Sequence, residues 1–254
     1  MAREATVTEH FERFEFKYWA PLPRVDAALR LLGGSMVEDE NAKKLGASQV
    51  NTSLYFDSPR FTFLEQHLCG SPDRIKLRVR YYGEQPRGDC FFEIKRRQNA
   101  VVMKRRAVLT LEQSQVLVHD ISRPLPVHNE ALEAFQYLAL RTQAQPWLLV
   151  RARRQAFRTL EPGIDVRLTV DSDVAWQPTR PPALLEPRQG LWRPITGGDD
   201  AHPRALVEVK FHDARPWWLG QLTQLLSPWR VSFSKYVAAA LQARRDPFFV
   251  TDAA

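Results

Sequence analysis

Cysteine is scarce in this chain, which has only Cys69 and Cys90 among its 254 residues. Their spacing fits neither a disulfide framework nor a set of zinc ligands, so the sequence predicts two buried, reduced thiols and excludes a structural zinc site. The six histidines are also scattered without the spacing of metal ligands. We therefore assign no catalytic or metal-binding role to any histidine.

Long apolar runs are absent as well. No stretch approaches the roughly 18 apolar residues of a membrane-spanning helix, and residues 1–6 lack the apolar core of a signal peptide. These absences predict a cytoplasmic protein with no membrane segment of its own. With 44% hydrophobic residues, a chain of 254 residues can bury a sizeable core as one large domain or two small ones.

Acidic residues are fewer than basic residues in this chain, with 29 Asp and Glu against 36 Lys and Arg. The formal net charge is +7 and the sequence pI is about 9.6, which favours anionic partners. Net charge alone does not separate polyphosphate from nucleic acid or from an acidic membrane surface. The arrangement of the cations along the chain carries more information.

Several segments place a charged residue at every second position. The clearest is 74–80, in which four cations alternate with Ile, Leu and Val, so that a strand would carry all four on one face. A solvated strand face usually mixes charge signs, and a row of one sign therefore indicates a site for a polyanion. Related alternation occurs in residues 91–97, 101–106, 150–158, 166–171 and 206–211.

This repetition predicts an α+β fold. The strands form an antiparallel β-barrel with the charged faces inside, and helices pack on the apolar faces outside. Helical patterns cover 23–32 and 129–141, a segment opened by Pro216, and a final helix that Ser232 or Ser234 caps. Residues 172–205 are rich in proline and glycine without a sustained period, which predicts a long loop.

Six short motifs occur in the order found in one protein family. They are Arg13-Phe14-Glu15-Phe16-Lys17-Tyr18, Tyr55-Phe56-Asp57, the strand carrying Lys76, Arg78 and Arg80, Phe92-Glu93-Ile94-Lys95, Glu208-Val209-Lys210-Phe211 and Ser234-Lys235-Tyr236. Together they resemble the VTC domain, the polyphosphate polymerase domain of the vacuolar transporter chaperone family, within the triphosphate tunnel metalloenzyme superfamily. The resemblance covers residues 10–242, leaves 1–9 and 243–254 as terminal tails, and points to the stand-alone bacterial type.

The resemblance implies an antiparallel β-barrel tunnel lined by Lys, Arg and Glu. The implied activity is transfer of the γ-phosphate of ATP to a growing inorganic polyphosphate chain, with a divalent metal, Mn²⁺ or Mg²⁺, bridging the phosphates. A polyphosphate that leaves water requires matching fixed cations. Arginine supplies bidentate contacts to phosphate oxygens and lysine supplies a movable point charge.

Residue roles follow from the same resemblance and from the shared strand faces. The predicted catalytic residues are Lys17, Arg78, Arg80, Lys95, Arg154 and Lys235. The predicted substrate-binding residues are Lys76, Lys104, Arg106, Arg167 and Lys210. Glu208 matches the metal-binding glutamate of the family, and its alternative role is an ion pair with Lys210.

Two other glutamates and two departures from the family pattern bear on the chemistry. Glu93 is interpreted as a structural partner that orients Lys95, with direct metal ligation as the alternative, and the same two roles are open for Glu15. Arg13 stands where hydrolytic members of the superfamily carry the first glutamate of Glu-x-Glu-x-Lys, which removes a ligand for a second, water-activating metal and favours synthesis over hydrolysis. Ala152 stands where the family tends to have tyrosine, a change that bears on nucleotide contact or tunnel shape.

Two alternatives remain beside the polymerase. A tripolyphosphatase or polyphosphatase would use the same tunnel with water as the acceptor, and a noncatalytic module would bind polyphosphate or nucleic acid. Nucleic acid is disfavoured because the residues between the cations are mostly Ile, Leu and Val, not exposed aromatic platforms. Eukaryotic members carry an SPX regulatory domain and membrane helices that this sequence lacks, so any regulation or export requires a separate membrane or regulatory partner.

Overall fold

The computed structural model describes residues 14–40, 49–99, 101–126, 128–179, 181–196, 203–212 and 216–246. Outside these residues lie His10, Arg13, His202, the predicted N-terminal tail, and the predicted C-terminal tail from residue 247 onward. Within the described ranges, no helix has both the length and the apolar character that crossing a membrane requires.

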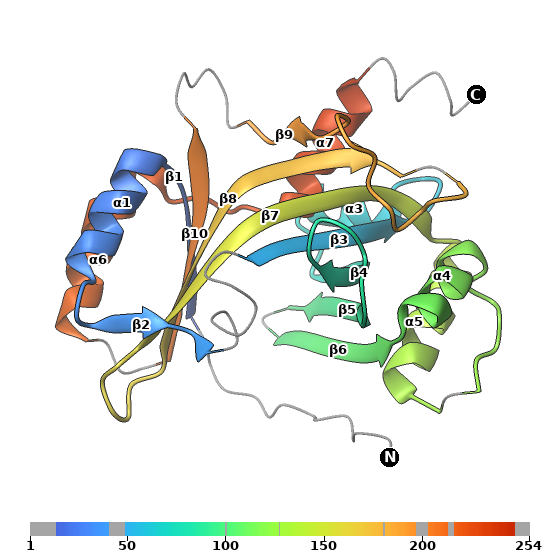
Figure 1. The fold of residues 1–254 in the computed structure, drawn as a ribbon, viewed down its shortest axis with the longest axis horizontal. Helices are drawn as coiled ribbons and strands as arrows, with labels where there is room; N and C mark the ends of the chain where they lie inside the picture. The colour runs from blue at the N-terminus through green and yellow to red at the C-terminus, as the bar shows by residue number, and fades with distance from the viewer. Residues whose placement is uncertain are drawn as a thin grey trace.

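A 10-stranded antiparallel sheet forms the centre of the molecule (Figure 1). Its strands are ordered β1-β10-β8-β7-β3-β4-β5-β6, with β2 paired to β7 and β9 paired to β8. The bounds are β1 Phe14–Pro21, β2 Met36–Glu38, β3 Gln49–Asp57, β4 Asp73–Tyr82, β5 Cys90–Gln98, β6 Val101–Leu109, β7 Gln145–Thr159, β8 Val166–Pro178, β9 Arg193–Pro194 and β10 Arg204–Phe211. The sheet with its accompanying helices confirms the predicted α+β class.

Two pairs of helices cover the convex face of the sheet. Figure 1 shows α1 beside α6 at one end and α4 beside α5 at the other. Buried side chains of α1 and α6 pack against β1, β8 and β10, whereas those of α4 and α5 pack against β3 to β6. The helices are α1 Leu22–Leu31, α3 Thr62–Leu68, α4 Leu111–His119, α5 Glu130–Thr142, α6 Trp217–Leu226 and α7 Lys235–Arg245, with a 3₁₀ turn η1 at Ser227–Trp229.

Strand β4 has the alternation that its sequence predicts. Leu77 and Val79 are fully buried on the convex side, and the cations between the apolar residues remain partly exposed. The predicted helix at 129–141 forms as α5, because the Asn129 side chain accepts hydrogen bonds from the backbone N–H groups of the first turn. Its apolar stripe, including Phe135, then packs on the sheet.

Two predictions are wrong. Residues 172–205 are not one long loop, because β8 continues through residue 178, and β9 and the first residues of β10 also fall in this range. Val174, Ala175 and Trp176 are all buried, so this part of β8 is covered on both faces and shows no period of two. Cys90 is buried as predicted, but Cys69 follows the end of α3 and is exposed.

The sheet curls until its two ends face each other. Its path of paired strands ends at β1 and β6, and the described residues of these two strands do not pair with each other. The curl is visible in the electrostatics: Lys95 on β5 lies in the field of Glu15 and Lys17 on β1 and of Lys210 on β10. The predicted tunnel is therefore a curled sheet without a hydrogen-bonded seam between its end strands.

Residues 230–236, which we call the closing segment, bridge the two ends of the sheet. On one side the backbone N–H of Val231 donates to the carbonyl of Lys17 at 2.9 Å. On the other side the Lys76 ammonium group donates to the Ser234 hydroxyl at 2.9 Å. The segment thus connects β1 to β4 where no strand pair does.

The last helix, α7, lies on the concave side of the sheet. Trp19 lies two residues after Lys17 and Leu206 lies two residues before Glu208, so both continue the same face of their strands. Buried residues of α7 pack against Trp19, Leu206 and other apolar side chains of this face. The concave face is therefore apolar beneath α7 and charged beyond its N-terminus.

Candidate functional site

The predicted site residues gather on the concave face. In the paired register Lys95 lies directly opposite Lys76 on β4 and Lys104 on β6, and Glu93 lies opposite Arg78 and Arg106. The contributions are Lys17 from β1, Lys76, Arg78 and Arg80 from β4, Lys95 from β5, Lys104 and Arg106 from β6, Arg154 from β7, Arg167 from β8, Glu208 and Lys210 from β10, and Lys235 from α7. Seven strands and one helix thus supply the site.

Glu93 is the centre of a first ion-pair cluster and is only 1% exposed. Arg78 contacts it through Nε at 2.7 Å and through Nη2 at 2.6 Å. Arg106 Nε donates to the other carboxylate oxygen at 2.8 Å, and Lys104 Nζ lies 3.0 Å from that oxygen. Arg80 is more distant, with Nε at 3.9 Å. One buried carboxylate therefore holds cations from both neighbouring strands.

The charge of Glu93 is fixed by these neighbours. Burial raises its pKa, but the charges of Arg78, Arg80, Lys104 and Arg106 outweigh burial and hold the pKa well below its ordinary value. The predicted role of Glu93 in orienting Lys95 is wrong. The reason is register: two arginines lie directly opposite Glu93 on the flanking strands, whereas Lys95 is two residues along the same strand.

A second cluster forms around Asp171, which is fully buried. Arg154 makes a bidentate contact, with Nε to Oδ1 at 2.6 Å and Nη2 to Oδ2 at 2.7 Å. Lys235 Nζ lies 2.5 Å from Asp171 and 3.8 Å from Glu208. This cluster joins strand β7 to the N-terminus of α7.

Glu208 continues the second cluster toward β1. Its oxygens lie 3.4 Å from Lys210 Nζ and 3.9 Å from Lys17 Nζ. Burial raises the pKa of Glu208, but Lys235, Lys210 and Lys17 outweigh it and lower the pKa to about 2. Glu15 also pairs with Lys17, at 3.0 Å. The ion pair of Glu208 with Lys210 is present, and the carboxylate is ionised at neutral pH.

Lys76, which is half-buried, and Lys95, which is exposed, differ from the other cations of the site. Among the described residues, neither ammonium group is paired with a carboxylate, and Lys76 donates only to the Ser234 hydroxyl. Burial, followed by the repulsion of Lys95 and Lys17, lowers the pKa of Lys76 to about 7. Although Lys95 is exposed, the surrounding protein atoms desolvate its ammonium group and lower its pKa, and Glu15 opposes this shift. These two lysines are thus the predicted site cations without an ion pair among the described residues.

Four predicted residues are exposed in the free protein, namely Lys95, Lys104, Arg106 and Arg167. The side chain of Arg167 is 57% exposed and pairs with Asp165 at 3.2 Å. Lys104 is 48% exposed although it reaches Glu93. Burial lowers the pKa of Lys104 to about 8 despite that carboxylate. The structure therefore separates these exposed cations from the enclosed set formed by Arg78, Arg80, Arg154 and Lys235.

The oxygen donors fit a metal that substrate phosphates help to hold. Among the described residues no group of three His, Cys, Asp or Glu side chains is placed to hold a metal ion. Glu208 supplies one ionised carboxylate among the site lysines, and Asp171 lies within its electrostatic field. Mg²⁺ and similar hard cations are commonly bound by one or two carboxylates together with substrate phosphates and water. Glu208 fits that kind of site.

Sequence reasoning missed the roles of two residues in this site. Asp171 is absent from the predicted site, although its bidentate contact anchors Arg154. Tyr55 accepts a hydrogen bond from Arg78 Nη1 at 3.1 Å. Burial raises the pKa of Tyr55, but Arg78 and Arg80 outweigh burial and lower it. The signal for Tyr55 was its place in the Tyr-Phe-Asp motif.

The departure at position 152 has a packing consequence. Ala152 is buried in the apolar cluster that α7 forms with the concave face. It lies opposite Asn51 in the register of β3 and β7. The small side chain at this position thus lies in the packing layer beneath α7.

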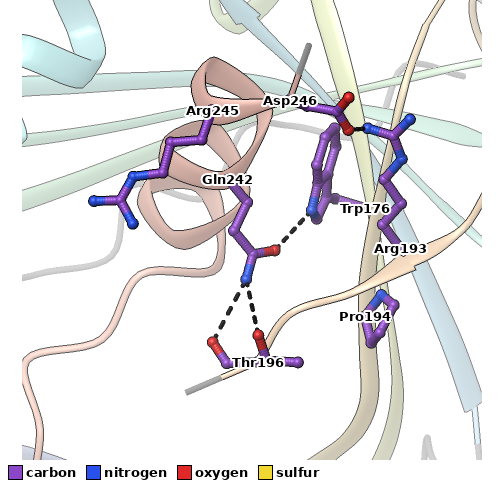
Figure 2. A pocket seen from close by; sticks show the side chains of 7 residues that line it. All are labelled: Trp176, Arg193, Pro194, Thr196, Gln242, Arg245 and Asp246. Atoms are coloured by element: carbon purple, nitrogen blue, oxygen red, sulfur yellow. Dashed lines mark hydrogen bonds and ion pairs between the residues drawn. The ribbon is translucent and has the colours of Figure 1, made fainter. Parts of the chain in front are cut away.

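A cavity of about 500 Å³ lies at the C-terminal end of α7 (Figure 2). Gln242 accepts a hydrogen bond from the Trp176 indole and donates to Thr196, and Asp246 pairs with Arg193. None of the predicted site residues lines this cavity. Its contacts attach the end of α7 to β8 and β9, away from the charged cluster at Lys235.

The curled antiparallel sheet, the helices outside it and the cations on its concave face define a protein of the triphosphate tunnel class. The VTC domain matches residues 12–243, and the chain belongs to that family. This confirms the family that the six motifs indicated.

One solved structure supports the fold independently. It is the crystal structure of a "putative adenylate cyclase" from Bacillus halodurans, which is 12% identical and has a TM-score of 0.50. The match covers 88% of this chain and 94% of that chain. At this identity the likeness shows a shared fold alone. The comparison with curated protein sequences gives no match.

Proposed function

We propose that this protein is a polyphosphate polymerase that transfers the γ-phosphate of ATP to a growing inorganic polyphosphate chain in its basic tunnel. The observation that carries the proposal is the division of the site cations into those that are paired with carboxylates and those that are not. Two clusters are anchored by Glu93 and by Asp171 with Glu208, whereas Lys76 and Lys95 have no carboxylate partner among the described residues. Membership in the VTC family supports the same activity.

The anchored cations suit phosphates that are held in place. Arg154 is fixed by a bidentate contact to Asp171, and Arg78 is fixed by two nitrogens that contact one oxygen of Glu93, so the orientation of both is set before any ligand binds. Their remaining N–H groups are available to phosphate oxygens. We assign the two clusters to the phosphates of the donor and of the acceptor chain, which remain bound during transfer.

Lys76 and Lys95 suit the group that moves. In phosphoryl transfer, the protein contributes mainly positioning and neutralisation of charge on the transferred group. The bond between the γ-phosphorus and the β,γ-bridging oxygen breaks, and the bond to a terminal oxygen of the acceptor chain forms. ADP departs with the electron pair, and an ionised terminal phosphate requires no base. The two unpaired ammonium groups can offset the negative charge on the transferred phosphoryl group, and no existing ion pair has to break for this.

Glu208 is the residue that would hold a divalent cation, Mn²⁺ or Mg²⁺. When bound, such an ion would neutralise charge on the phosphate oxygens. Lys17, Lys210 and Lys235 surround this carboxylate. They bind phosphate oxygens next to it and keep it ionised, so it is available as a ligand at neutral pH.

The test is incubation of the purified protein with ATP and Mn²⁺, with and without a short polyphosphate primer. ADP, orthophosphate and chain length are resolved over time. The proposal predicts longer chains with one ADP formed per phosphate added. Formation of orthophosphate without longer chains would contradict the polymerase and indicate a hydrolase that uses the same tunnel. Binding of polyphosphate without turnover would indicate a noncatalytic module.

A further inference from the structure

Asp57, at the end of β3, is a buried carboxylate that the phosphate site does not use. It is 3% exposed and faces no cation among its hydrogen-bond partners. Oδ1 accepts hydrogen bonds from the backbone N–H groups of Ser58 at 2.7 Å and Phe63 at 2.9 Å, and Oδ2 accepts one from Leu64 at 3.0 Å. These bonds tie the carboxylate rigidly to the start of α3.

The remaining donor comes from a residue 179 positions further along the chain. The hydroxyl of Tyr236, in the first turn of α7, donates to Oδ2 of Asp57. The Tyr236 ring also stacks on Tyr55, with ring centroids 5.0 Å apart. Both tyrosine side chains are buried. The Tyr-Phe-Asp and Ser-Lys-Tyr motifs, which lie far apart in the sequence, therefore meet in one contact.

This contact lies one residue from the phosphate site. Lys235, which precedes Tyr236, reaches Asp171 at 2.5 Å and Glu208 at 3.8 Å. Ser234 caps α7 by accepting a hydrogen bond from the backbone N–H of Val237 at 3.4 Å. The cations of the second cluster come from strands, except Lys235, which depends on how α7 is seated.

The other end of α7 is held separately. Gln242 joins Trp176 to Thr196, and Asp246 pairs with Arg193 (Figure 2). These contacts fix the position of the helix body on β8 and β9. They lie more than one helical turn from Lys235, so the contacts made within the first turn itself are those of Ser234, Lys235 and Tyr236.

We propose that the contact between Asp57 and Tyr236 positions Lys235 in the phosphate site. Tyr236 is thus a positioning residue that acts through Lys235 and touches no phosphate itself. The functional meaning of this positioning rests on the proposed phosphate-binding function. The contact and its effect on Lys235 are measurable without any ligand.

The test uses the Tyr236→Phe variant, which removes the hydroxyl and keeps the ring that stacks on Tyr55. The rate at which an amine-modifying reagent labels Lys235 is measured by mass spectrometry in the free protein. The proposal predicts labelling at least about threefold faster than in the wild type, as expected when a coupled contact is lost. An unchanged labelling rate in a folded Tyr236→Phe variant would overturn it.

Tyr81→Phe is the matched control. Tyr81 is also fully buried, and its hydroxyl donates to the carbonyl of Leu185 at 2.9 Å on the convex side. The same chemical change there is expected to leave Lys235 labelling unaltered. Asp57→Asn, which keeps the shape of the side chain, provides a second variant and should also expose Lys235. Equal acceleration of Lys235 labelling in Tyr81→Phe would mean that general loosening, and not this contact, is responsible.

A double-mutant cycle connects the contact to ligand binding. Lys235→Gln should weaken tripolyphosphate binding in the wild type by about tenfold, and by less than about threefold in the Tyr236→Phe background. Equal factors in both backgrounds would contradict the positioning role. If wild-type protein binds no tripolyphosphate, the proposed function fails, while the labelling result still decides whether Asp57 and Tyr236 position Lys235.

Discussion

The cations of the concave face are not equivalent at the scale of single residues. Arg78 and Arg154 each face a carboxylate that is nearly or completely buried, whereas Lys76 and Lys95 pair with no carboxylate among the described residues. Removing a partner from a buried ion pair leaves an uncompensated charge. Removing an unpaired ammonium group relieves repulsion. The two kinds of cation therefore make opposite contributions to the stability of the free protein.

The Arg154→Gln variant is expected to be less stable than the wild type by about 1–3 kcal/mol, because fully buried Asp171 then keeps Lys235 as its one ionic partner among the described residues. Lys95→Gln is expected to be as stable as the wild type or more stable. Arg167→Gln, in an exposed pair with Asp165, should change little. Urea unfolding of the free proteins measures all three. An Arg154→Gln protein of wild-type stability would contradict the division.

Lys76 gives the site a specific dependence on pH. Its pKa is about 7 in the free protein, and a bound phosphate raises it because an anion stabilises the protonated form. Binding therefore takes up a proton above pH 7, and affinity falls as the pH rises through the pKa of the complex. Calorimetry of tripolyphosphate binding in buffers of different ionisation enthalpy measures this uptake.

Lys76→Arg is the matched variant for the pH experiment, because arginine keeps its charge throughout this range. Protons taken up by the ligand are common to both proteins and cancel in the comparison. We expect smaller proton uptake and a flatter dependence on pH in the variant. Identical uptake by the two proteins would show that Lys76 is already charged before the ligand binds.

At the scale of elements, the N-terminus of α7 contributes more to the site than its place near the end of the chain suggests. It supplies Lys235, and the Ser234 hydroxyl before it caps the helix and accepts a hydrogen bond from Lys76. Helix α4 is capped in a similar way by Thr110, but on the convex side. Substitution of each cap in turn can therefore distinguish an effect on stability from an effect on ligand binding.

Ser234→Ala and Thr110→Ala are each expected to lower stability by about 1 kcal/mol, as loss of a cap does. Only Ser234→Ala is expected to weaken tripolyphosphate binding, because the first turn of α7 carries Lys235 into the site. Thermal unfolding and calorimetry on both variants provide the comparison. Equal loss of affinity in Thr110→Ala would mean that affinity follows overall stability.

The elements also show what sequence patterns reveal and conceal. The charged rows on β4 and β5 were predictable because one face of each strand is charged and the other packs on helices. The sequence pattern did not indicate the second half of β8, because α7 and β9 cover it. The strand then has no solvent-exposed face and no alternation of polar and apolar residues. The partners of Glu93 were also hidden, since the register between strands decides which cations lie opposite it.

At the scale of the whole molecule, the family motifs predicted the tunnel fold, but not how the sheet ends meet. The closing segment, which bridges β1 and β4, is neither strand nor helix before Lys235. Its sequence therefore has no periodic pattern of apolar and polar residues from which its position could be predicted. The meeting of Asp57 with Tyr236 is likewise a tertiary contact between distant motifs. Local propensity carries no signal for such contacts.

The net charge of +7 attracts anionic ligands to the whole molecule, in addition to the contacts that the site provides. Tripolyphosphate at about 100 times its dissociation constant should stabilise the folded protein by about 2.7 kcal/mol. The stabilisation should shrink as salt rises, because screening shortens the reach of the field. Thermal unfolding at several salt concentrations tests this, with sulfate at matched ionic strength as control. An equal shift with sulfate would indicate nonspecific anion binding.

The central claim is that phosphoryl transfer to polyphosphate takes place on the concave face, at the unpaired lysines. The most direct measurement follows ATP labelled at the γ-phosphate, with Mn²⁺ and a primer, in the wild type and in Lys95→Gln. The account predicts label in lengthening chains for the wild type and little in the variant, whose melting temperature holds or rises. Label in orthophosphate alone, or chain labelling at the wild-type rate in Lys95→Gln, would contradict it.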